Sequence, residues 1–211
     1  MLKWIYTVIT LALFAPLVMG QNAQQVLTSL EQKYPSDQCI RVAFTLTYHT
    51  PDGKEESLKG KAWRMSDKYR IQMPEQWIVS NGETLWNYLR DIDEIHIEDA
   101  SEDGEEFNPA NFITYYQKAG YIPGLTLDKQ TSEGHIQHIS FKPEDKEAEI
   151  VKARLELVDG SPKAIFAFYR NGIKTEVNIN SISPISSPDE KLFRLDPSDY
   201  PEAYIEDLRM D

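Results

Sequence analysis

The segment Trp77 to Tyr88, WIVSNGETLWNY, predicts a β-hairpin. An Asn-Gly pair between two apolar runs favours a two-residue type I′ turn, because both central residues of that turn need a positive φ. Pairing outward from this turn sets residues of the two strands opposite each other: Val79 and Thr84, Ile78 and Leu85, Trp77 and Trp86. One face of the hairpin then holds four large apolar side chains: Trp77, Val79, Trp86 and Tyr88.

Alternation of apolar and polar residues predicts antiparallel strands on both sides of this hairpin. The expected strand regions are residues 42–65 with a Pro-Asp-Gly turn, then 68–74, 95–97, 135–143, 148–160, 162–182 and 191–197. Asn171-Gly172 predicts a second hairpin turn, and Asp159-Gly160 predicts another reversal. The pattern indicates one long antiparallel meander.

Two or three helices are expected beside these strands, and the sequence indicates the position of two of them. Residues 22–34 place one apolar stripe at three- and four-residue spacing, and Pro35 ends the run. A second, short helix is expected to begin at Asn108 and Pro109 and to end at Gly120 and Pro123-Gly124. Its apolar side consists of three aromatic residues: Phe112, Tyr115 and Tyr116.

Length, charge and cysteine content limit the class of protein. Residues 1–20 contain a lysine, an apolar run and a small-residue cleavage site, so a cleaved secretory signal is expected before Gln21. Residues 21–211 then form one domain, in which the single cysteine, Cys39, is expected to be a buried apolar residue. Removal of Lys3 with the signal leaves 21 basic and 34 acidic residues, a net charge of −13. That charge argues against nucleic acid and anionic bilayers as partners.

Enzyme and metal signatures are weak in this sequence. His135 and His138 are three apart on an expected strand and therefore point to opposite faces. His96 is interpreted as sharing a face with neither Glu94 nor Glu98, and as part of a solvated strand. The sequence has no nucleophile elbow, S-x-x-K motif or phosphate-binding glycine loop. We therefore expect no catalytic residues, no metal and no cofactor.

Aromatic residues are the clearest excess on the expected strands. A flat sheet with one buried face explains each residue singly, as ordinary core, but explains the set less well. A strongly bent sheet with helices over its concave face would enclose an apolar hollow suited to a lipid-like ligand. The candidate lining residues are Phe44, Leu46, Trp63, Tyr69, Ile71, Met73, Trp86, Tyr88, Phe112, Tyr115, Tyr116, Phe166 and Phe168.

The run GKAWRMSDKYRIQMPEQWIVSNGETLWNYLRDIDEIHI resembles the LolA family of periplasmic outer-membrane lipoprotein carriers. It matches the family's Gly-x-x-Trp strand, an aromatic-basic strand, a proline and a V-S-D-G-x-T-L-W-x-Y hairpin, here with Asn81 for the usual aspartate. FNPANFI and KLFRLDPSDYPEAYIEDLR are similar to a helix start and to the closing strand and tail of the family. Where the family often has Arg-Pro after the Trp strand, with the arginine tied to cavity opening, this chain has Ser66-Asp67.

The resemblance implies a fold and a function. The fold would be mainly β (α+β), an incomplete, strongly curved antiparallel β-barrel with helices covering its concave apolar face. The function would be shielding lipoprotein acyl chains in an apolar cavity between the inner and outer membranes, by a monomer in the periplasm. The implied partners are acylated lipoproteins, an inner-membrane lipoprotein-releasing ABC transporter and an outer-membrane receptor.

Two other classes of function remain open. One is another periplasmic lipid-binding or envelope-sensing domain of the same fold. The other is an exported hydrolase whose nucleophile and base meet only after folding. Co-purifying acylated polypeptide would indicate the carrier, free phospholipid the related domain, and neither of them the hydrolase.

Overall fold

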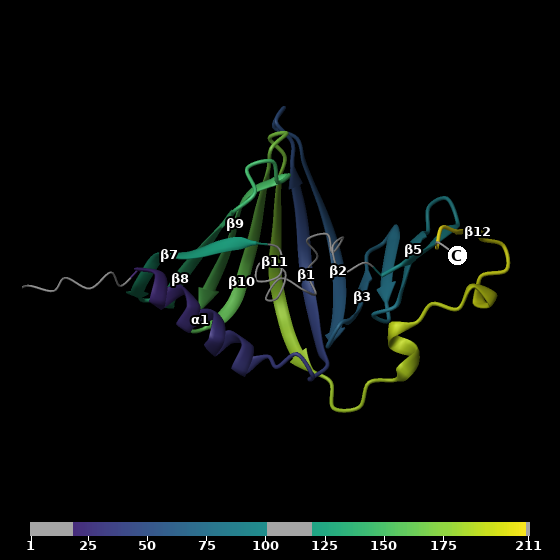
Figure 1. The fold of residues 1–211 in the computed structure, drawn as a ribbon, viewed down its shortest axis with the longest axis horizontal. Helices are drawn as coiled ribbons and strands as arrows, with labels where there is room; N and C mark the ends of the chain where they lie inside the picture. The colour runs from purple at the N-terminus through teal and green to yellow at the C-terminus, as the bar shows by residue number, and fades with distance from the viewer. Residues whose placement is uncertain (1–18, 101–119, 210–211) are drawn as a thin grey trace, which may run out of the picture.

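A computed structural model describes residues 19–100 and 120–209 of the chain (Figure 1). It contains helix α1 (Met19–Lys33) and twelve strands. The first six strands are β1 (Ile40–His49), β2 (Glu55–Met65), β3 (Lys68–Gln72), β4 (Gln76–Ser80), β5 (Thr84–Leu89) and β6 (Glu94–Asp99). The others are β7 (Tyr121–Thr131), β8 (Gly134–Pro143), β9 (Ile150–Val158), β10 (Ser161–Tyr169), β11 (Lys174–Pro184) and β12 (Tyr204–Asp207). Two 3₁₀ turns, η1 (Glu190–Phe193) and η2 (Pro197–Asp199), precede β12.

All twelve strands belong to one sheet, ordered β12-β6-β5-β4-β3-β2-β1-β11-β10-β9-β8-β7. Pairing of β1 with β11 joins two antiparallel meanders, β1 to β6 and β7 to β11, and only β12 pairs in parallel, with β6. Strands β7 and β12 are the two edges, so the sheet does not close into a barrel. The mainly-β, incomplete antiparallel architecture expected from the sequence is therefore confirmed.

Irregular pairing within the strands accounts for the bending of this sheet. The register shifts once between β1 and β11, where Asn180 of β11 is the extra residue, once between β7 and β8, and twice between β9 and β10. A bulge adds an unpaired residue to one strand, which bends that strand and increases its local twist. In Figure 1, β7 to β10 lie on one side of β1 and β2, and β3 to β6 lie on the other.

Helix α1 confirms the first helix expected from the sequence. Its apolar stripe places Ala23, Leu27 and Leu30 in the main core, each at most 2% exposed, and it packs beside β7. In Figure 1 the helix lies across the half of the sheet that contains β7 to β10. The second expected helix, with Phe112, Tyr115 and Tyr116, and the expected signal segment up to residue 18 lie outside the described residues. No helix in the described part is long and apolar enough to span a membrane.

The hairpin between β4 and β5 differs from the expected one by two residues in register. Ser80 pairs with Leu85 and Val79 with Trp86, which leaves a four-residue loop instead of a two-residue type I′ turn. Only Gly82 in this loop has a positive φ, of 90°. The Asn81 side-chain oxygen accepts hydrogen bonds from the main-chain N–H groups of Glu83 (2.9 Å) and Thr84 (2.7 Å) and thus stabilises the longer loop. A shift of two keeps every side chain on its expected face.

Two other expectations are wrong. Pro123 and Gly124 do not end a helix but lie within β7, where an edge strand tolerates a proline that cannot donate to the ladder. Residues 191–197 do not form a strand, because the Asp189 carboxylate accepts a hydrogen bond from the Lys191 N–H and begins the 3₁₀ turn η1. The apolar alternation in this segment instead buries Phe193 and Leu195 against the sheet.

Candidate functional site

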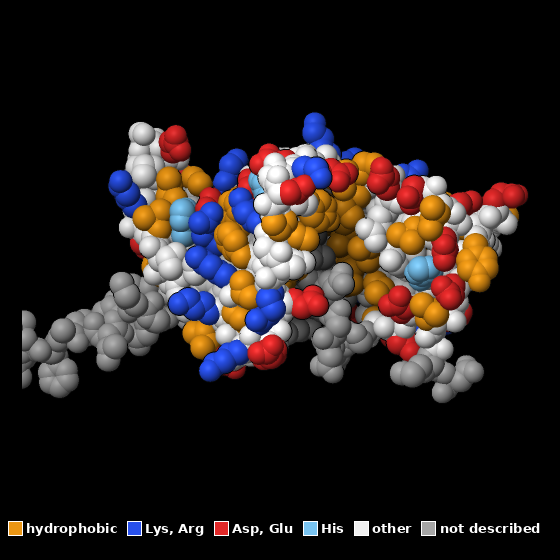
Figure 2. Space-filling model, turned by 90° about the horizontal axis from the view of Figure 1, so that it is seen from above, with side chains coloured by type: hydrophobic (Ala, Val, Ile, Leu, Met, Phe, Trp, Pro, Cys, Tyr) orange, Lys and Arg blue, Asp and Glu red, His pale blue; other side chains and the backbone are white. Residues whose placement is uncertain are grey.

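One face of the sheet, here called the helix-side face, forms a continuous apolar surface. Val42, Ala62, Ile71 and Ile78 lie directly opposite one another across β1, β2, β3 and β4, and α1 packs into the same cluster. The buried strand residues of this cluster are Ile40, Val42, Phe44, Leu46, Ala62, Ile71, Ile139, Phe141, Ile150, Ala153, Leu155, Leu157, Ile165, Ala167, Val177 and Ile179. Seen from above, the molecule is hollowed near its middle, and hydrophobic side chains form the visible wall of the hollow (Figure 2).

Partly exposed apolar side chains border this cluster. They include Tyr69, Met73, Ile78, Tyr121, Leu125, Tyr169 and Ile182, and all of them pack against the buried set. These side chains pack against the apolar cluster but are still partly exposed. They are therefore the described residues best placed to contact an apolar ligand. Met73 adds a flexible thioether that adapts to irregular shapes.

Gly60 leaves room for an aromatic ring on the helix-side face. Gly60 of β2 pairs with Phe44 of β1, and a Cβ atom added at Gly60 would overlap the Phe44 ring. The absence of a side chain therefore lets the ring lie over the backbone of β2. Phe44 is 1% exposed in this position.

Arg64 is the buried charge of the helix-side face. It lies on the same face as Ala62, two residues away, and its side chain is 4% exposed. Its Nη2 donates to the main-chain oxygens of Tyr34 (3.2 Å) and Pro35 (3.3 Å), at the C-terminal end of α1. Burial lowers the pKa of the guanidinium from its ordinary value, and the carbonyl-rich helix end is a favourable place for the remaining positive charge.

A small pocket lies beside α1. Its volume is about 370 Å³, and it is enclosed by Gln25, Val26, Ser29, Leu30, Asp128, Gln137, Leu157 and Gly160. The Asp128 carboxylate in this pocket bonds to His135 (2.5 Å) and Gln137 (3.2 Å), which lower its pKa. The polar lining distinguishes this pocket from the apolar surface over β1 to β4.

A second apolar cluster lies on the opposite face of β4, β5 and β6. Val79, Trp86, Tyr88, Ile95 and Ile97 form it together with Leu195, and Trp77, Tyr200 and Ala203 pack around it. The covering residues come from the segment 190–207, here called the C-terminal strap. Figure 1 shows this strap running outside the sheet from the end of β11 to β12.

Aromatic rings and arginines hold the C-terminal strap against the sheet. The Tyr200 ring centroid lies 4.8 Å from that of Tyr88 and 6.4 Å from that of Trp77. Arg70 packs over Trp77 and donates from Nη1 to the main-chain oxygens of Leu192 (3.2 Å) and Arg194 (3.4 Å). The aromatic hairpin face is therefore the core beneath the strap.

The structure divides the residues that the sequence suggested for an apolar cavity. Five lie on the helix-side face: Phe44, Leu46, Tyr69, Ile71 and Met73. Trp86 and Tyr88 lie on the opposite face beneath the C-terminal strap, so they do not share a surface with the first five. Trp63, Phe166 and Phe168 also lie on the opposite face, where Arg154 and Lys174 pack over Phe166. Phe112, Tyr115 and Tyr116 lie outside the described residues.

Sequence reasoning missed several residues of the helix-side face. Ile78 is not on the apolar hairpin face that the sequence indicated, yet it pairs with Ile71 and borders the main cluster. Tyr121 lies in the segment that was expected to end a helix, and Leu125 was given no assignment, but both are strand residues two positions from Pro123 and join the same cluster. Tyr121, Pro123 and Leu125 stand at every second position, and this spacing could have predicted a strand here.

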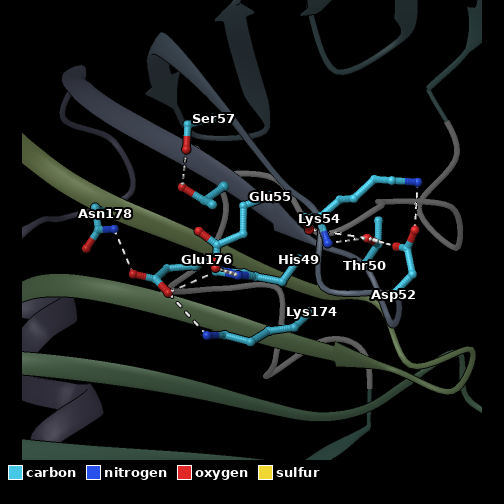
Figure 3. Close-up of polar contacts among 10 residues, drawn as sticks. His49, Thr50, Asp52, Lys54, Glu55, Ser57, Lys174, Glu176 and Asn178 are labelled. Carbon is cyan, nitrogen blue, oxygen red and sulfur yellow. Dashed lines mark hydrogen bonds and ion pairs between the residues drawn. The ribbon is translucent and has the colours of Figure 1, made fainter.

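A polar network joins three strands on the opposite face (Figure 3). His49 Nδ1 lies 2.9 Å from a Glu55 oxygen, and His49 Nε2 lies 3.5 Å from a Glu176 oxygen. Burial opposes ionisation of Glu176, but hydrogen bonds from Asn178 and Lys174 outweigh it and lower the pKa of the carboxyl. Ser57 bonds to Thr47 rather than to the imidazole, so this network does not combine a nucleophile with a base.

The other histidines also contact carboxylates. His135 bonds to Asp128 and His138 lies 3.7 Å from Glu156, so the two histidines face different partners, as their spacing predicted. His96 corrects the sequence interpretation: residues two apart share a strand face, and its Nε2 lies 2.8 Å from Glu94. Through β12, His96 also faces Glu206, at 3.5 Å.

Comparison with known proteins identifies one family and several solved structures of similar fold. The model of the family described as outer membrane lipoprotein carrier protein LolA matches residues 63–196, more than half of the chain. No protein of curated function matches the sequence.

Solved structures share the fold at low sequence identity. A domain from Vibrio parahaemolyticus named for outer membrane lipoprotein sorting is 9% identical, with a TM-score of 0.51, over 83% of this chain and 97% of that one. A DUF1329 family protein from Desulfovibrio piger has the same identity and coverage and a TM-score of 0.50. A LolA superfamily protein from Nitrosomonas europaea is 13% identical, with a TM-score of 0.45, over 82% of this chain and 97% of that one.

Proposed function

Because the chain belongs to the LolA family of outer membrane lipoprotein carrier proteins, we propose that it is a periplasmic carrier of lipoproteins. Family membership supports a lipid- or lipoprotein-binding domain in the periplasm, without an enzymatic role. The finer proposal is that the helix-side face shields the acyl chains of lipoproteins while they travel from the inner to the outer membrane. Residues 21–211 would form the carrier domain after removal of the signal segment.

The observation that supports this role is the apolar continuity of the helix-side face across β1 to β4, with a hollow beside it (Figure 2). Burial of an acyl chain contributes about 0.8 kcal/mol per methylene, so a lipoprotein with several chains does not cross water unaided. A carrier must cover these methylenes with apolar side chains. The bordering residues, among them Met73 and Ile78, provide such a surface without being fully buried themselves.

The C-terminal strap supports the choice of face. On the opposite face, Leu195 and Tyr200 already cover Trp86 and Tyr88, so that aromatic surface has an occupant within the chain. Acyl chains would have to displace the strap to reach it. The helix-side face is consequently the better candidate for cargo.

Release of cargo would depend on separation of α1 from the sheet. Arg64 bonds to the last carbonyls of α1, while Ser66, in the position of the family's Arg-Pro, donates its N–H to the Ser36 oxygen at 2.6 Å. Both contacts fasten the chain that follows α1, the first to the end of β2 and the second to the turn after it. We propose that Arg64 supplies the positioning contact at this end of the hollow.

The partners that follow from this role are acylated lipoproteins, an inner-membrane lipoprotein-releasing ABC transporter and an outer-membrane receptor. The protein would act as a monomer. Its net charge of −12 over the full chain reduces adhesion to anionic bilayers, which suits a carrier that must leave each membrane.

Capture of a triacylated lipoprotein tests the proposal. Met73→Glu and Ile78→Glu place a carboxylate on the border of the helix-side face, and Phe168→Glu is the matched control on the opposite face. We expect wild type and the control to retain detergent-depleted lipoprotein in a pull-down, and both border variants to lose it while keeping their circular dichroism spectrum. Equal retention by all four folded proteins would refute the proposed binding face, and no retention by wild type would refute the carrier role.

A further inference from the structure

At the β12 edge of the sheet, three side chains bring together atoms that bind divalent cations. Glu94 and His96 lie two residues apart on one face of β6, and parallel pairing sets Glu206 of β12 opposite His96. One imidazole nitrogen and two carboxylate oxygens, one atom from each residue, all lie within 4.8 Å of one another. We propose that Glu94, His96 and Glu206 form a Zn²⁺ site that fastens the C-terminal strap to the sheet.

The distances fit a zinc ion after small side-chain movements. Bonds of about 2.0 to 2.2 Å in a tetrahedral arrangement place ligand atoms roughly 3.4 Å apart. His96 Nε2 and the Glu206 oxygen are already 3.5 Å apart, and Nε2 lies 2.8 Å from the Glu94 oxygen. Exposed side-chain fractions of 24% for His96, 26% for Glu94 and 44% for Glu206 leave the fourth position open to water.

The charge around the three residues favours a cation. Two carboxylates face one imidazole, and Glu98 adds a third negative charge nearby. Within the described residues, no lysine or arginine forms an ion pair with Glu94 or Glu206. The other histidine sites differ, because Lys174 neutralises Glu176 beside His49 and Arg154 neutralises Glu156 beside His138.

The ligand types favour zinc over the harder cations. Imidazole nitrogen suits Zn²⁺, whereas Mg²⁺ and Ca²⁺ prefer sites made entirely of oxygen. Zinc also tolerates a site with three protein ligands and one open position. A bound ion would join β6 to β12, two strands that are more than a hundred residues apart in the sequence, and would hold the strap over the second apolar cluster.

Titration of the chelator-treated full-length mature protein with ZnCl₂ tests this site. By calorimetry we expect one Zn²⁺ per chain and a rise in melting temperature, with no comparable effect of MgCl₂. His96→Asn and Glu206→Gln should each weaken binding by at least about tenfold and abolish the thermal shift. His138→Asn is the matched control, because His138 also faces a glutamate, and it should bind as wild type does.

Hydrogen exchange separates a metal link from a merely structural ion pair. The Leu208 N–H donates to the Ile97 oxygen at 2.8 Å, so slower exchange of this amide on zinc addition would show that the ion fastens β12. Glu206 is a partly exposed residue of the edge strand β12, so Glu206→Gln is expected to fold. This variant therefore still tests the site if His96→Asn does not fold. Absence of saturable Zn²⁺ binding, or binding unchanged in both ligand variants, would overturn the proposal whether or not the protein transports lipoproteins.

Discussion

The guanidinium of Arg64 donates a hydrogen bond to the main-chain oxygen of Tyr34, 3.2 Å away, and thereby ties β2 to the end of α1. The contact joins α1 to the sheet against which its apolar stripe packs. Because Arg64 is 4% exposed, water does not readily replace it as a partner for the helix end. Loss of this contact should therefore loosen α1 more than it disturbs the strands.

We expect Arg64→Met to lower the free energy of unfolding by about 1.5 to 3 kcal/mol, the range for hydrogen bonds to a charged group. The variant should also bind a fluorescent acyl probe faster, because α1 separates from the sheet more readily. Urea denaturation and stopped-flow fluorescence measure the two effects. Arg41→Met, at an exposed position of β1, is the control. Unchanged binding rates in a destabilised Arg64→Met protein would mean that α1 does not control entry.

Gly60→Ala tests the contact between Phe44 and the backbone of β2. The added methyl group would overlap the Phe44 ring, and overpacking of this kind costs about 1 to 3 kcal/mol. Gly124→Ala is the matched control, since a Cβ atom at Gly124 meets nothing within 4 Å and its φ is not positive. Thermal melting of both variants gives the comparison. A Gly60→Ala protein as stable as Gly124→Ala would show that the ring can move aside without cost.

Leu195→Ala should separate stability from cargo binding. Leu195 belongs to the C-terminal strap and is 2% exposed in the second apolar cluster, so truncation should cost about 2 to 5 kcal/mol, as for other buried leucines. At a temperature where the variant is still folded, it should retain triacylated lipoprotein as wild type does, because the helix-side face is unchanged. Pull-down beside a melting curve measures both properties. Loss of retention by folded Leu195→Ala would instead indicate that cargo uses the aromatic cluster.

The sequence was sufficient to predict most of the strands and most of the residues that share a face, although β7 was missed and residues 191–197 were wrongly predicted as a strand. Alternation at every second residue gave β1 to β6 and β8 to β11, and the register error at Asn81 left the faces intact because it was a shift of two. The conformation of the hairpin loop depends on the Asn81 side-chain oxygen, which accepts hydrogen bonds from the N–H groups of Glu83 and Thr84. An Asn-Gly pair is compatible both with this longer loop and with a type I′ turn, so the sequence pattern did not distinguish them.

The position of the candidate site could only partly be predicted. Alternation separates Val79 and Trp86 from Ile71 and Ile78, but it does not say which of the two groups faces α1. That depends on the C-terminal strap, where Leu195 and Tyr200 approach β4 and β5 from more than a hundred residues away. Alternation at Phe193 and Leu195 indicated that these residues share a face, but it gave no indication of the surface that they cover.

The pH dependence of the β12 edge provides the final prediction. The hydrogen bond that His96 donates to the Glu94 carboxylate, opposed by burial and aided by the charges of Glu94, Glu206 and Glu98, raises the pKa of His96 above its ordinary value of 6.5. A group whose pKa is raised by folding adds stability that is fully present below the unfolded pKa and is lost as pH rises through the folded pKa. Protonated His96 therefore holds β12 at low pH, and this contribution disappears as the imidazole becomes neutral.

We expect the difference in melting temperature between wild type and His96→Asn, measured in chelator, to shrink as the pH rises from 6.5 through the raised pKa. His138→Asn, whose glutamate is also paired with Arg154, controls for the general effect of removing a histidine. Exchange of the Leu208 amide, corrected for its intrinsic pH dependence, should accelerate over the same interval because this group bonds across β12 and β6. If the difference between wild type and His96→Asn stays constant over this range, the imidazolium does not hold the strap, and packing of Leu195 and Tyr200 alone keeps it in place.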